Sequence, residues 1–154
     1  MTRILFVCLG NICRSPLAEA IFKAKIIEKG LASNFEADSC GTAGYHIGVP
    51  PDPRTLSNAL KNNVIIRHVG RQFHSEDFEK FDLILPMDYS NHSNLLRLRE
   101  GKAHAHRIKL MRTFDPLDKG ADVPDPYHGT EKDFQEVFEI LNRSVENLIQ
   151  TLAK

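Results

Sequence analysis

A cysteine and an arginine separated by five residues form the pair in this sequence whose types and spacing best suit a chemical reaction. Cys8 and Arg14 bound this segment, and Ser15 and Pro16 follow it. The short apolar run before Cys8 indicates a buried strand, and Ser15-Pro16 is a typical helix start. A loop that joins a strand to a helix N-terminus turns its N–H groups and the positive end of the helix toward one point, which favours a tetrahedral dianion such as phosphate. The residues expected to hold that anion are Leu9, Gly10, Asn11, Ile12, Cys13, Arg14 and Ser15.

The side chains of this segment complement one another chemically. Arg14 supplies a planar, permanently charged fork for bidentate contact with two oxygens of the anion. The same positive field favours the thiolate form of Cys8, which is the nucleophilic form of cysteine. Ser15 is expected to donate its hydroxyl proton to the sulfur and to help the thiolate leave again in a second step. Gly10 permits a close backbone approach to the anion, and Asn11 tolerates a left-handed conformation if the loop requires one.

Each of these residues also has an ordinary structural interpretation. A cysteine at the end of a buried strand commonly packs as a small hydrophobe, and a single arginine is commonly a solvated surface cation. Ser15 before Pro16 is accounted for as a helix cap. The spacing of Cys8 and Arg14 on a strand, loop and helix favours the catalytic interpretation, with Cys8 as the nucleophile and Arg14 as the anion clamp.

The rest of the chain predicts the elements that must position this loop. Compact or alternating apolar runs predict strands over residues 4–7, 35–39, 83–85 and 107–114. Helical spacing predicts helices from residue 15 to a stop at 30, and over 53–61, 75–81, 88–98 and 134–152. Strands that alternate with helices are typical of an α/β domain with a parallel sheet. Pro86 should end or bulge the third strand, and segments 41–53 and 115–129 should form loops at the sheet edge.

Length and composition limit the class of protein. A chain of residues 1–154 has the size of a single domain, so we expect one domain with one site. Twenty Lys and Arg residues against twenty Asp and Glu residues give no overall field that would attract nucleic acid or an anionic membrane. The apolar run at the start is too short for a membrane span and lacks the build of a signal peptide. Three cysteines without an export signal fit a reducing compartment, so a cytoplasmic location is expected.

The segment from Val7 to Pro16, Val-Cys-Leu-Gly-Asn-Ile-Cys-Arg-Ser-Pro, resembles the signature of the low-molecular-weight protein tyrosine phosphatases. Further motifs follow in the order and spacing of that family over almost the whole chain. They include Tyr45-His46-Ile47-Gly48, Pro51-Asp52-Pro53-Arg54, Met87-Asp88 and Asp125-Pro126-Tyr127.

This resemblance implies a fold, an activity and a set of supporting residues. The fold would be a four-stranded parallel sheet in the order 2-1-3-4 with helices on both faces. The activity would be hydrolysis of protein phosphotyrosine or of small aryl phosphates through a cysteinyl-phosphate intermediate. It would need no metal or other cofactor, and the protein would act as a monomer. Asn11, Ser39, His68 and Asp88 would form a hydrogen-bonding shell that shapes the phosphate loop.

Three aspartates that precede proline compete for the role of proton donor. An aryl phosphate leaves as a phenolate whose conjugate acid has a pKa of about 10, so a positioned acid should matter. Asp52, Asp115 and Asp125 are each followed by Pro, which favours extended geometry and by itself predicts only a turn or loop. Asp125 differs because it lies between Pro124 and Pro126, which hold its carboxyl at low entropic cost. The resemblance selects the same residue, so we expect Asp125 to be the general acid and base.

The aryl ring of such a substrate needs a slot beside the loop. Ile12, Tyr45 and Tyr127 are the expected walls, although each of these residue types is equally common in a core. Tyr45 stands where some members of the family carry Trp, and His128 where some carry a second Tyr. Selectivity among aryl groups therefore stays open.

Oxidation of a thiolate at Cys8 introduces a further question. A sulfenic acid is trapped as a disulfide when another thiol lies close to it. Cys13 is held in the same loop, and Cys40 stands where the family commonly carries Gly or Ala. We expect Cys13 to be the partner and keep Cys40 as the alternative.

Three rival functions fit the sequence less well. Arsenate reduction by a related thiol enzyme needs two further cysteines in the second half of the chain, and none follows Cys40. A module that binds phosphorylated partners without turnover would need neither Cys8 nor Asp125. The spacing of the cysteines and histidines matches no structural zinc pattern, so no metal ligand is expected.

Overall fold

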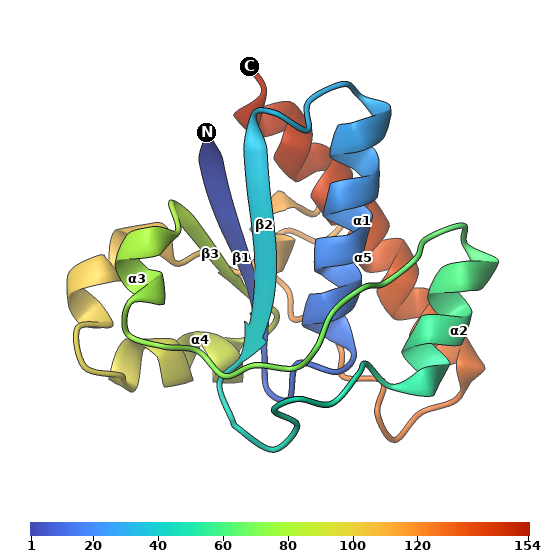
Figure 1. The fold of residues 1–154 in the computed structure, drawn as a ribbon, viewed down its shortest axis with the longest axis horizontal. Helices are drawn as coiled ribbons and strands as arrows, with labels where there is room; N and C mark the ends of the chain where they lie inside the picture. The colour runs from blue at the N-terminus through green and yellow to red at the C-terminus, as the bar shows by residue number, and fades with distance from the viewer.

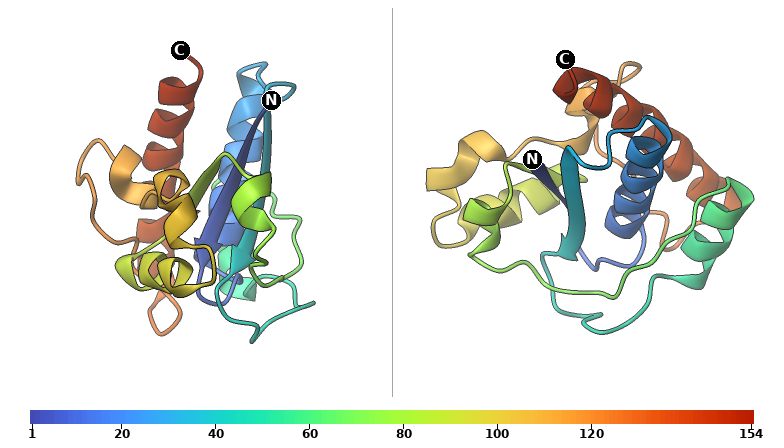
Figure 2. Two further views of the ribbon diagram at one scale, coloured as in Figure 1. Left: turned by 90° about the vertical axis from the view of Figure 1, so that its left-hand side faces the viewer. Right: turned by 45° about the horizontal axis from the view of Figure 1, so that its top comes forward.

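A three-stranded parallel sheet with helices on both faces forms the framework of the protein. The computed structural model covers residues 1–154. The α-helices and strands are β1 (Thr2–Cys8), α1 (Arg14–Glu28), β2 (Phe35–Gly41), α2 (Pro53–Lys61), α3 (Asp77–Lys80), β3 (Leu83–Pro86), α4 (Tyr89–Arg97) and α5 (Glu131–Leu152), with 3-10 helices η1 (Lys102–Arg107) and η2 (Met111–Phe114) before α5. The strand order is β2-β1-β3, so the strand that ends at Cys8 is central. Helices α1 and α5 cover one side of the sheet, and α3 and α4 lie on the other (Figures 1 and 2).

The central strand is apolar on both faces because both faces are covered. Ile4 and Phe6 belong to the larger of two buried clusters, which includes residues of α1 and α5. Leu5 and Val7 belong to the smaller cluster on the opposite face. A continuous apolar run of this kind is typical of a parallel strand buried between two layers.

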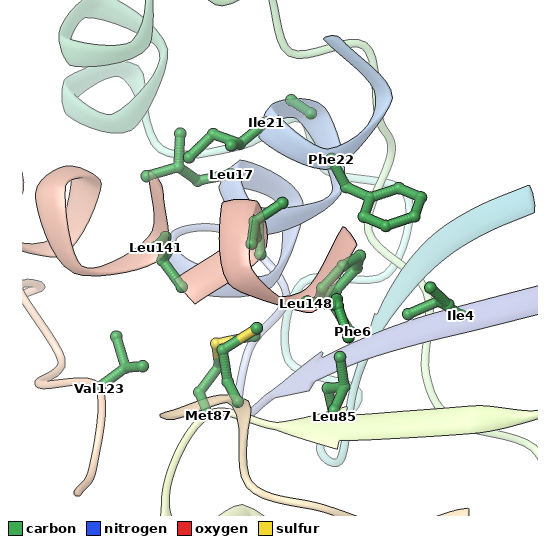
Figure 3. Packing of buried hydrophobic residues seen from close by; sticks show 14 of the residues in the cluster. Ile4, Phe6, Leu17, Ile21, Phe22, Leu85, Met87, Val123, Leu141 and Leu148 are labelled. Atoms are coloured by element: carbon green, nitrogen blue, oxygen red, sulfur yellow. The ribbon is translucent and has the colours of Figure 1, made fainter. Parts of the chain in front are cut away.

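Packing of α1 against the sheet fixes the helix relative to the end of β1. Phe22 of α1 packs on Phe6 of β1 with ring centroids 5.8 Å apart, and Leu141 and Leu148 of α5 lie in the same cluster (Figure 3). Both ends of the short loop between β1 and α1 are therefore anchored in the core. The position of the loop follows from that packing.

The predicted elements around this core are confirmed with one exception. The strands expected over 4–7, 35–39 and 83–85 and all five expected helices are present, and the boundaries 53–61 of α2 match the prediction. Strand β3 ends at Pro86, where an end or a bulge was predicted, although the Met87 N–H still donates to the Val7 carbonyl at 2.9 Å. None of the helices has the length and apolar character needed to span a membrane.

The predicted strand over residues 107–114 is wrong, and the sheet has three strands in place of the four expected. Ile108 makes a single parallel bridge to Ile84, and the N–H of Lys109 donates to the Ile84 carbonyl at 3.0 Å. The alternation of buried and exposed residues stops after Leu110, because Met111 and Arg112 are both buried as well. The chain then turns into η2. At the edge of β3, where the order 2-1-3-4 places a fourth strand, the chain therefore makes only this single bridge.

Two long loops meet at the edge of the sheet where the strands end. In the loop after β2, the N–H of Thr42 donates to the Cys8 carbonyl at 2.9 Å. In the loop before α5, the N–H of Val123 donates to the Met87 carbonyl at 2.8 Å. Both loops therefore surround the carboxyl end of β1, which is the usual location of a ligand site in parallel α/β sheets.

Candidate active site

The segment between Cys8 and Arg14 is a tight loop with the Cys8 sulfur at its centre. The N–H of Asn11 donates to Cys8 Sγ at 3.3 Å, and Ser15 Oγ lies 3.0 Å from the same sulfur. Cys8 is only 3% exposed. Hydrogen bonds of this kind stabilise a negatively charged sulfur.

Asn11 adopts the left-handed conformation that this residue type tolerates, with φ of +58°. Its side-chain amide donates to Ser15 Oγ at 2.8 Å and to Ser39 Oγ at 3.1 Å. Its side-chain oxygen, Oδ1, accepts from the backbone N–H of Arg71 at 3.0 Å and lies 2.7 Å from His68 Nε2. A left-handed conformation costs a residue other than glycine about 1–2 kcal/mol. These four contacts offset that cost and fix the shape of the loop.

Glu19 extends this network behind the loop. Ser39 Oγ donates to Glu19 Oε1 at 2.7 Å, His68 Nδ1 lies 3.2 Å from the same oxygen, and Lys23 Nζ lies 2.5 Å from Oε2. Burial by itself would raise the pKa of Glu19, but the hydrogen bonds from His68, Lys23 and Ser39 lower it. Glu19 is a site residue that the sequence patterns did not indicate. The available signal was an acidic residue one helical turn after Ser15, among apolar residues of α1.

Glu19, Asp38 and His68 form a cluster of possible metal ligands whose donor atoms lie within 4.8 Å of one another. Each side chain already has a partner. Glu19 pairs with Lys23, Asp38 Oδ2 lies 2.9 Å from Arg71 Nε, and the imidazole contacts the loop asparagine. These partners account for the cluster as a network of ion pairs and hydrogen bonds, and we assign it no metal.

Arg14 is held by one of its two terminal nitrogens. Its Nη1 donates to Asp88 Oδ2 at 2.7 Å and to the Val123 carbonyl at 2.9 Å. Its Nη2 lies 3.8 Å from Asp125 Oδ2. Burial alone would lower the pKa of Arg14, but the neighbouring Cys8 and Asp88 raise it. The guanidinium is therefore a fixed cation beside the loop, with its Nε–Nη2 edge left for other contacts.

Two of the three candidate aspartates have structural partners. Asp52 caps α2 by accepting from the Arg54 N–H at 2.8 Å, and its Oδ2 lies 2.9 Å from the Arg54 guanidinium. The side chain of Asp115 is fully buried, and it accepts from Arg112 Nε at 2.9 Å and from Arg143 Nε at 2.8 Å. Asp52 adjoins the loop, since its N–H donates to the Ile12 carbonyl at 2.9 Å, but both carboxylates are occupied by arginines from outside the loop.

The buried ion pairs of Asp115 make its charge part of the stability of the fold. Burial by itself would raise the pKa of Asp115, but hydrogen bonds from Arg143, the Leu117 N–H and Arg112 lower it to about 2. Because this value lies below the ordinary one of about 4, the carboxylate stabilises the folded state above pH 4. That contribution is lost as the pH falls from about 4 to about 2.

Asp125 is the aspartate that faces the loop. Its side chain is 51% exposed, and its Oδ1 accepts from the Tyr127 N–H at 3.1 Å. Its other oxygen is the one that lies near Arg14 Nη2. This carboxyl is thus close to the fixed cation and open to solvent, which distinguishes it from Asp52 and Asp115.

A cleft of about 440 Å³ brings most of the predicted site residues together. Its lining consists of Cys8, Leu9, Gly10, Ile12, Cys13, Arg14, Tyr45, His46, Asp125, Tyr127 and His128. The three residues expected as walls of a slot, Ile12, Tyr45 and Tyr127, are all among them. Ser39 and His68 contact the loop from behind through Asn11, and Asp88 does so through Arg14. His46 was not singled out as a site residue, although it lies within a motif that was.

The two other cysteines differ in their access to this cleft. Cys13 lines it, whereas Cys40 is fully buried in the smaller core cluster. Burial raises the pKa of Cys13 to about 12 and that of Cys40 well above its ordinary value. Both are therefore thiols at neutral pH.

Comparisons with known proteins agree on one family. Residues 3–154 match the family model described as low molecular weight phosphotyrosine protein phosphatase. The human low molecular weight phosphotyrosine protein phosphatase is 43% identical over 137 residues, which cover 88% of this chain and 86% of the human one. A low molecular weight protein-tyrosine-phosphatase of Streptomyces coelicolor is 40% identical over 149 residues, 96% of this chain and 91% of its own. The crystal structure of a protein tyrosine phosphatase from Entamoeba histolytica, with Hepes in the active site, superposes with a TM-score of 0.94 at 40% identity, covering 99% of this chain and 97% of that one.

Proposed function

The chain belongs to the low molecular weight phosphotyrosine protein phosphatase family, and from this premise we propose that it hydrolyses protein phosphotyrosine and other aryl phosphate monoesters through a cysteinyl-phosphate intermediate. It is a low molecular weight protein-tyrosine-phosphatase. One observation carries the proposed mechanism. Cys8, Arg14 and Asp125 line a single cleft, so that a nucleophile, a cation and a carboxyl can act on one phosphate group.

The phosphate group binds to the loop and to the free edge of Arg14. Because Nη1 is engaged by Asp88 and Val123, the Nε–Nη2 edge is the part of the guanidinium that remains for two phosphate oxygens. The backbone N–H groups of residues 9–15 and the N-terminus of α1 supply the other contacts. These groups also stabilise the charge of the transition state, because their positions are fixed before the substrate arrives.

In the first step the Cys8 thiolate attacks phosphorus. An S–P bond forms while the bond from phosphorus to the phenolic oxygen breaks, and the carboxylic acid of Asp125 gives its proton to the departing oxygen. The phenol leaves, and phosphate remains attached to Cys8. Asp125 is then a carboxylate.

In the second step Asp125 takes a proton from water, and the oxygen of that water attacks phosphorus. The S–P bond breaks, and its electrons return to Cys8 as a thiolate, which the Ser15 hydroxyl at 3.0 Å and the Asn11 N–H at 3.3 Å stabilise. Inorganic phosphate leaves, and Asp125 is again protonated. One chain supplies every group in the cycle, so we propose that the protein works as a monomer.

Two phosphopeptides that differ only in the phosphorylated residue, phosphotyrosine in one and phosphoserine in the other, test this proposal. We expect kcat/KM for phosphotyrosine to be about ten- to a hundredfold higher, because burial of an aromatic ring between Ile12, Tyr45 and Tyr127 contributes about 1.5–3 kcal/mol. Release of inorganic phosphate is the measurement. Equal rates would contradict the aryl slot, and no release from either peptide, with a small aryl phosphate also left intact, would contradict the phosphatase assignment.

Peroxide is expected to inactivate the protein reversibly through a disulfide between Cys8 and Cys13. Peroxide oxidises the Cys8 thiolate to a sulfenic acid, and the sulfur of Cys13 then displaces water from it to form the S–S bond. The negative charge of Cys8 is one of the causes that raise the pKa of Cys13, so its loss in the sulfenic acid favours the attack. A reducing compartment such as the cytoplasm, which we propose as the location, would keep Cys8 active.

Peptide mapping after peroxide, followed by treatment with dithiothreitol, measures this outcome. The Cys13→Ser variant should lose recovery of activity, and the Cys40→Ser variant should keep it, since Cys40 does not line the cleft. A disulfide between Cys8 and Cys40, or recovery in Cys13→Ser equal to that of the wild type, would show that the partner is wrongly assigned.

A further inference from the structure

A second hollow, of about 370 Å³, opens beside the active-site cleft. It lies between the segment that follows β2 and the C-terminal end of α4, and Asn94, Arg97 and Leu98 line its far side. Leu9 and Tyr45 line both this hollow and the cleft. The two spaces are therefore neighbours that share a wall.

The lining of this hollow combines exposed apolar groups with one cation. Leu9 is 40% and Leu98 43% exposed, and Tyr45 also presents its ring to solvent. Arg97 is exposed, its guanidinium donates only to Asn94 Oδ1 at 3.3 Å, and it forms no ion pair with a carboxylate. By contrast, each arginine around the phosphate loop has a carboxylate partner, as Arg14 and Arg71 do. The hollow therefore has an uncompensated positive charge at its edge.

Another hollow, between α2 and α5, provides a contrast to the unpaired Arg97, because its cations have carboxylate partners. It has a volume of about 290 Å³, and Arg54 and Lys61 line it. Arg54 is paired with Asp52, and Lys61 is paired with Glu131. Both cations are neutralised from within the chain, so this surface offers no comparable attraction for an acidic group.

We propose that the hollow next to Leu9 and Tyr45 receives an acidic side chain of the polypeptide that carries the phosphotyrosine. When the ring occupies the cleft, the main chain of the substrate must leave at the rim, where Tyr45 separates the two spaces. Because the two spaces share Leu9 and Tyr45 as a wall, we place the acidic residue within about three positions of the phosphotyrosine, a span of about 10 Å in an extended chain. Arg97 pairs with the carboxylate, and Leu9 and Leu98 contact the adjoining methylene groups or an apolar neighbour.

This inference rests on the proposed function and adds a class of substrate to it. A small aryl phosphate ends inside the cleft and cannot reach Arg97. A protein substrate can do so, and an Asp or Glu close to its phosphotyrosine distinguishes it from other phosphoproteins. The protein would then select among polypeptides by charge at a site separate from the reacting atoms.

Matched phosphotyrosine peptides with Glu or Gln at one position at a time, within about three residues on either side, test the inference. Hydrolysis of a small aryl phosphate by the same preparation is the internal reference. At the best position we expect the wild type to favour the Glu peptide about two- to fivefold in kcat/KM, which is the range for a partly exposed ion pair. High salt should reduce this preference.

Variants of Arg97 and of its exposed neighbour Arg99, which does not line the hollow, provide the comparison. Arg97→Ala should lose the preference for Glu over Gln, Arg97→Glu should invert it, and Arg99→Ala should keep it. If the wild type shows no preference at any position, or if Arg97→Ala retains it, the inference is overturned while hydrolysis of the reference compound leaves the proposed function intact. Failure to hydrolyse the reference compound would instead contradict the proposed function itself.

Discussion

Cys8→Ser is expected to reduce hydrolysis of an aryl phosphate roughly 10⁴-fold or more while inorganic phosphate still binds. The loop that stabilises a thiolate cannot ionise an alcohol to a useful degree, so the nucleophile is lost. The backbone N–H groups and Arg14 remain, and they are the groups that hold the anion. Arg14→Lys should lose both functions, because a point charge cannot replace the Nε–Nη2 edge of the guanidinium. Steady-state kinetics and calorimetric titration with phosphate or vanadate measure the two properties separately.

Cys13→Ser is the matched control for this variant. It makes the same chemical change in the same cleft, at a residue whose side chain has no role in the proposed cycle and whose backbone N–H the substitution keeps. It should therefore retain most of the hydrolytic rate. A Cys8→Ser variant that keeps more than a few per cent of the wild-type rate, in a preparation free of wild-type protein, would rule out Cys8 as the nucleophile.

Asp125→Asn is expected to lower kcat/KM for an unactivated aryl phosphate by roughly 10²- to 10⁴-fold, with phosphate affinity nearly unchanged. The amide can neither protonate the departing phenolate nor accept a proton from water. The loss should shrink for esters of acidic phenols, since a stable phenolate leaves without a proton. A series of substituted aryl phosphates measures this dependence, and kcat/KM isolates the steps up to cleavage of the ester.

Asp52→Asn is the control that the structure favours. Asn caps a helix about as well as Asp, so α2 should persist, and the substitution changes a carboxylate to an amide at a second residue before proline. Asp115→Asn is a poorer control, because it leaves Arg112 and Arg143 without their buried partner and should cost about 3–5 kcal/mol of stability. A larger loss in Asp52→Asn than in Asp125→Asn, with the same dependence on the leaving group, would mean that the acid is wrongly assigned.

The parts of the site that depend on short sequence spacing could be predicted. The distance from Cys8 to Arg14 along the chain, a buried strand before it and a helix start after it are local features, and they specify the loop. The apolar periodicity of β1 and α5 likewise specifies which elements cover the sheet. The strand expected at 107–114 failed because three residues of alternation do not reveal where a strand gives way to a 3-10 helix.

Contacts between distant parts of the chain could not be predicted in the same way. Asp52, Asp115 and Asp125 look alike locally, since each precedes proline. What separates Asp115 from Asp125 is a partner on α5, Arg143, 28 residues further along the chain. The role of Glu19 also depends on a distant partner. The imidazole of His68 approaches α1 from a segment without regular structure.

The left-handed Asn11 has a thermodynamic consequence for the phosphate loop. Its partners His68 and Arg71 lie 57 and 60 residues away along the chain, so its conformation depends on folding of the whole domain. Anion affinity and the folding equilibrium are therefore linked, and each oxyanion bound by the loop shifts the population toward the native state. The same reciprocity means that local opening of the segment around residues 68–71, which removes these two contacts, lowers the affinity of the loop for the anion.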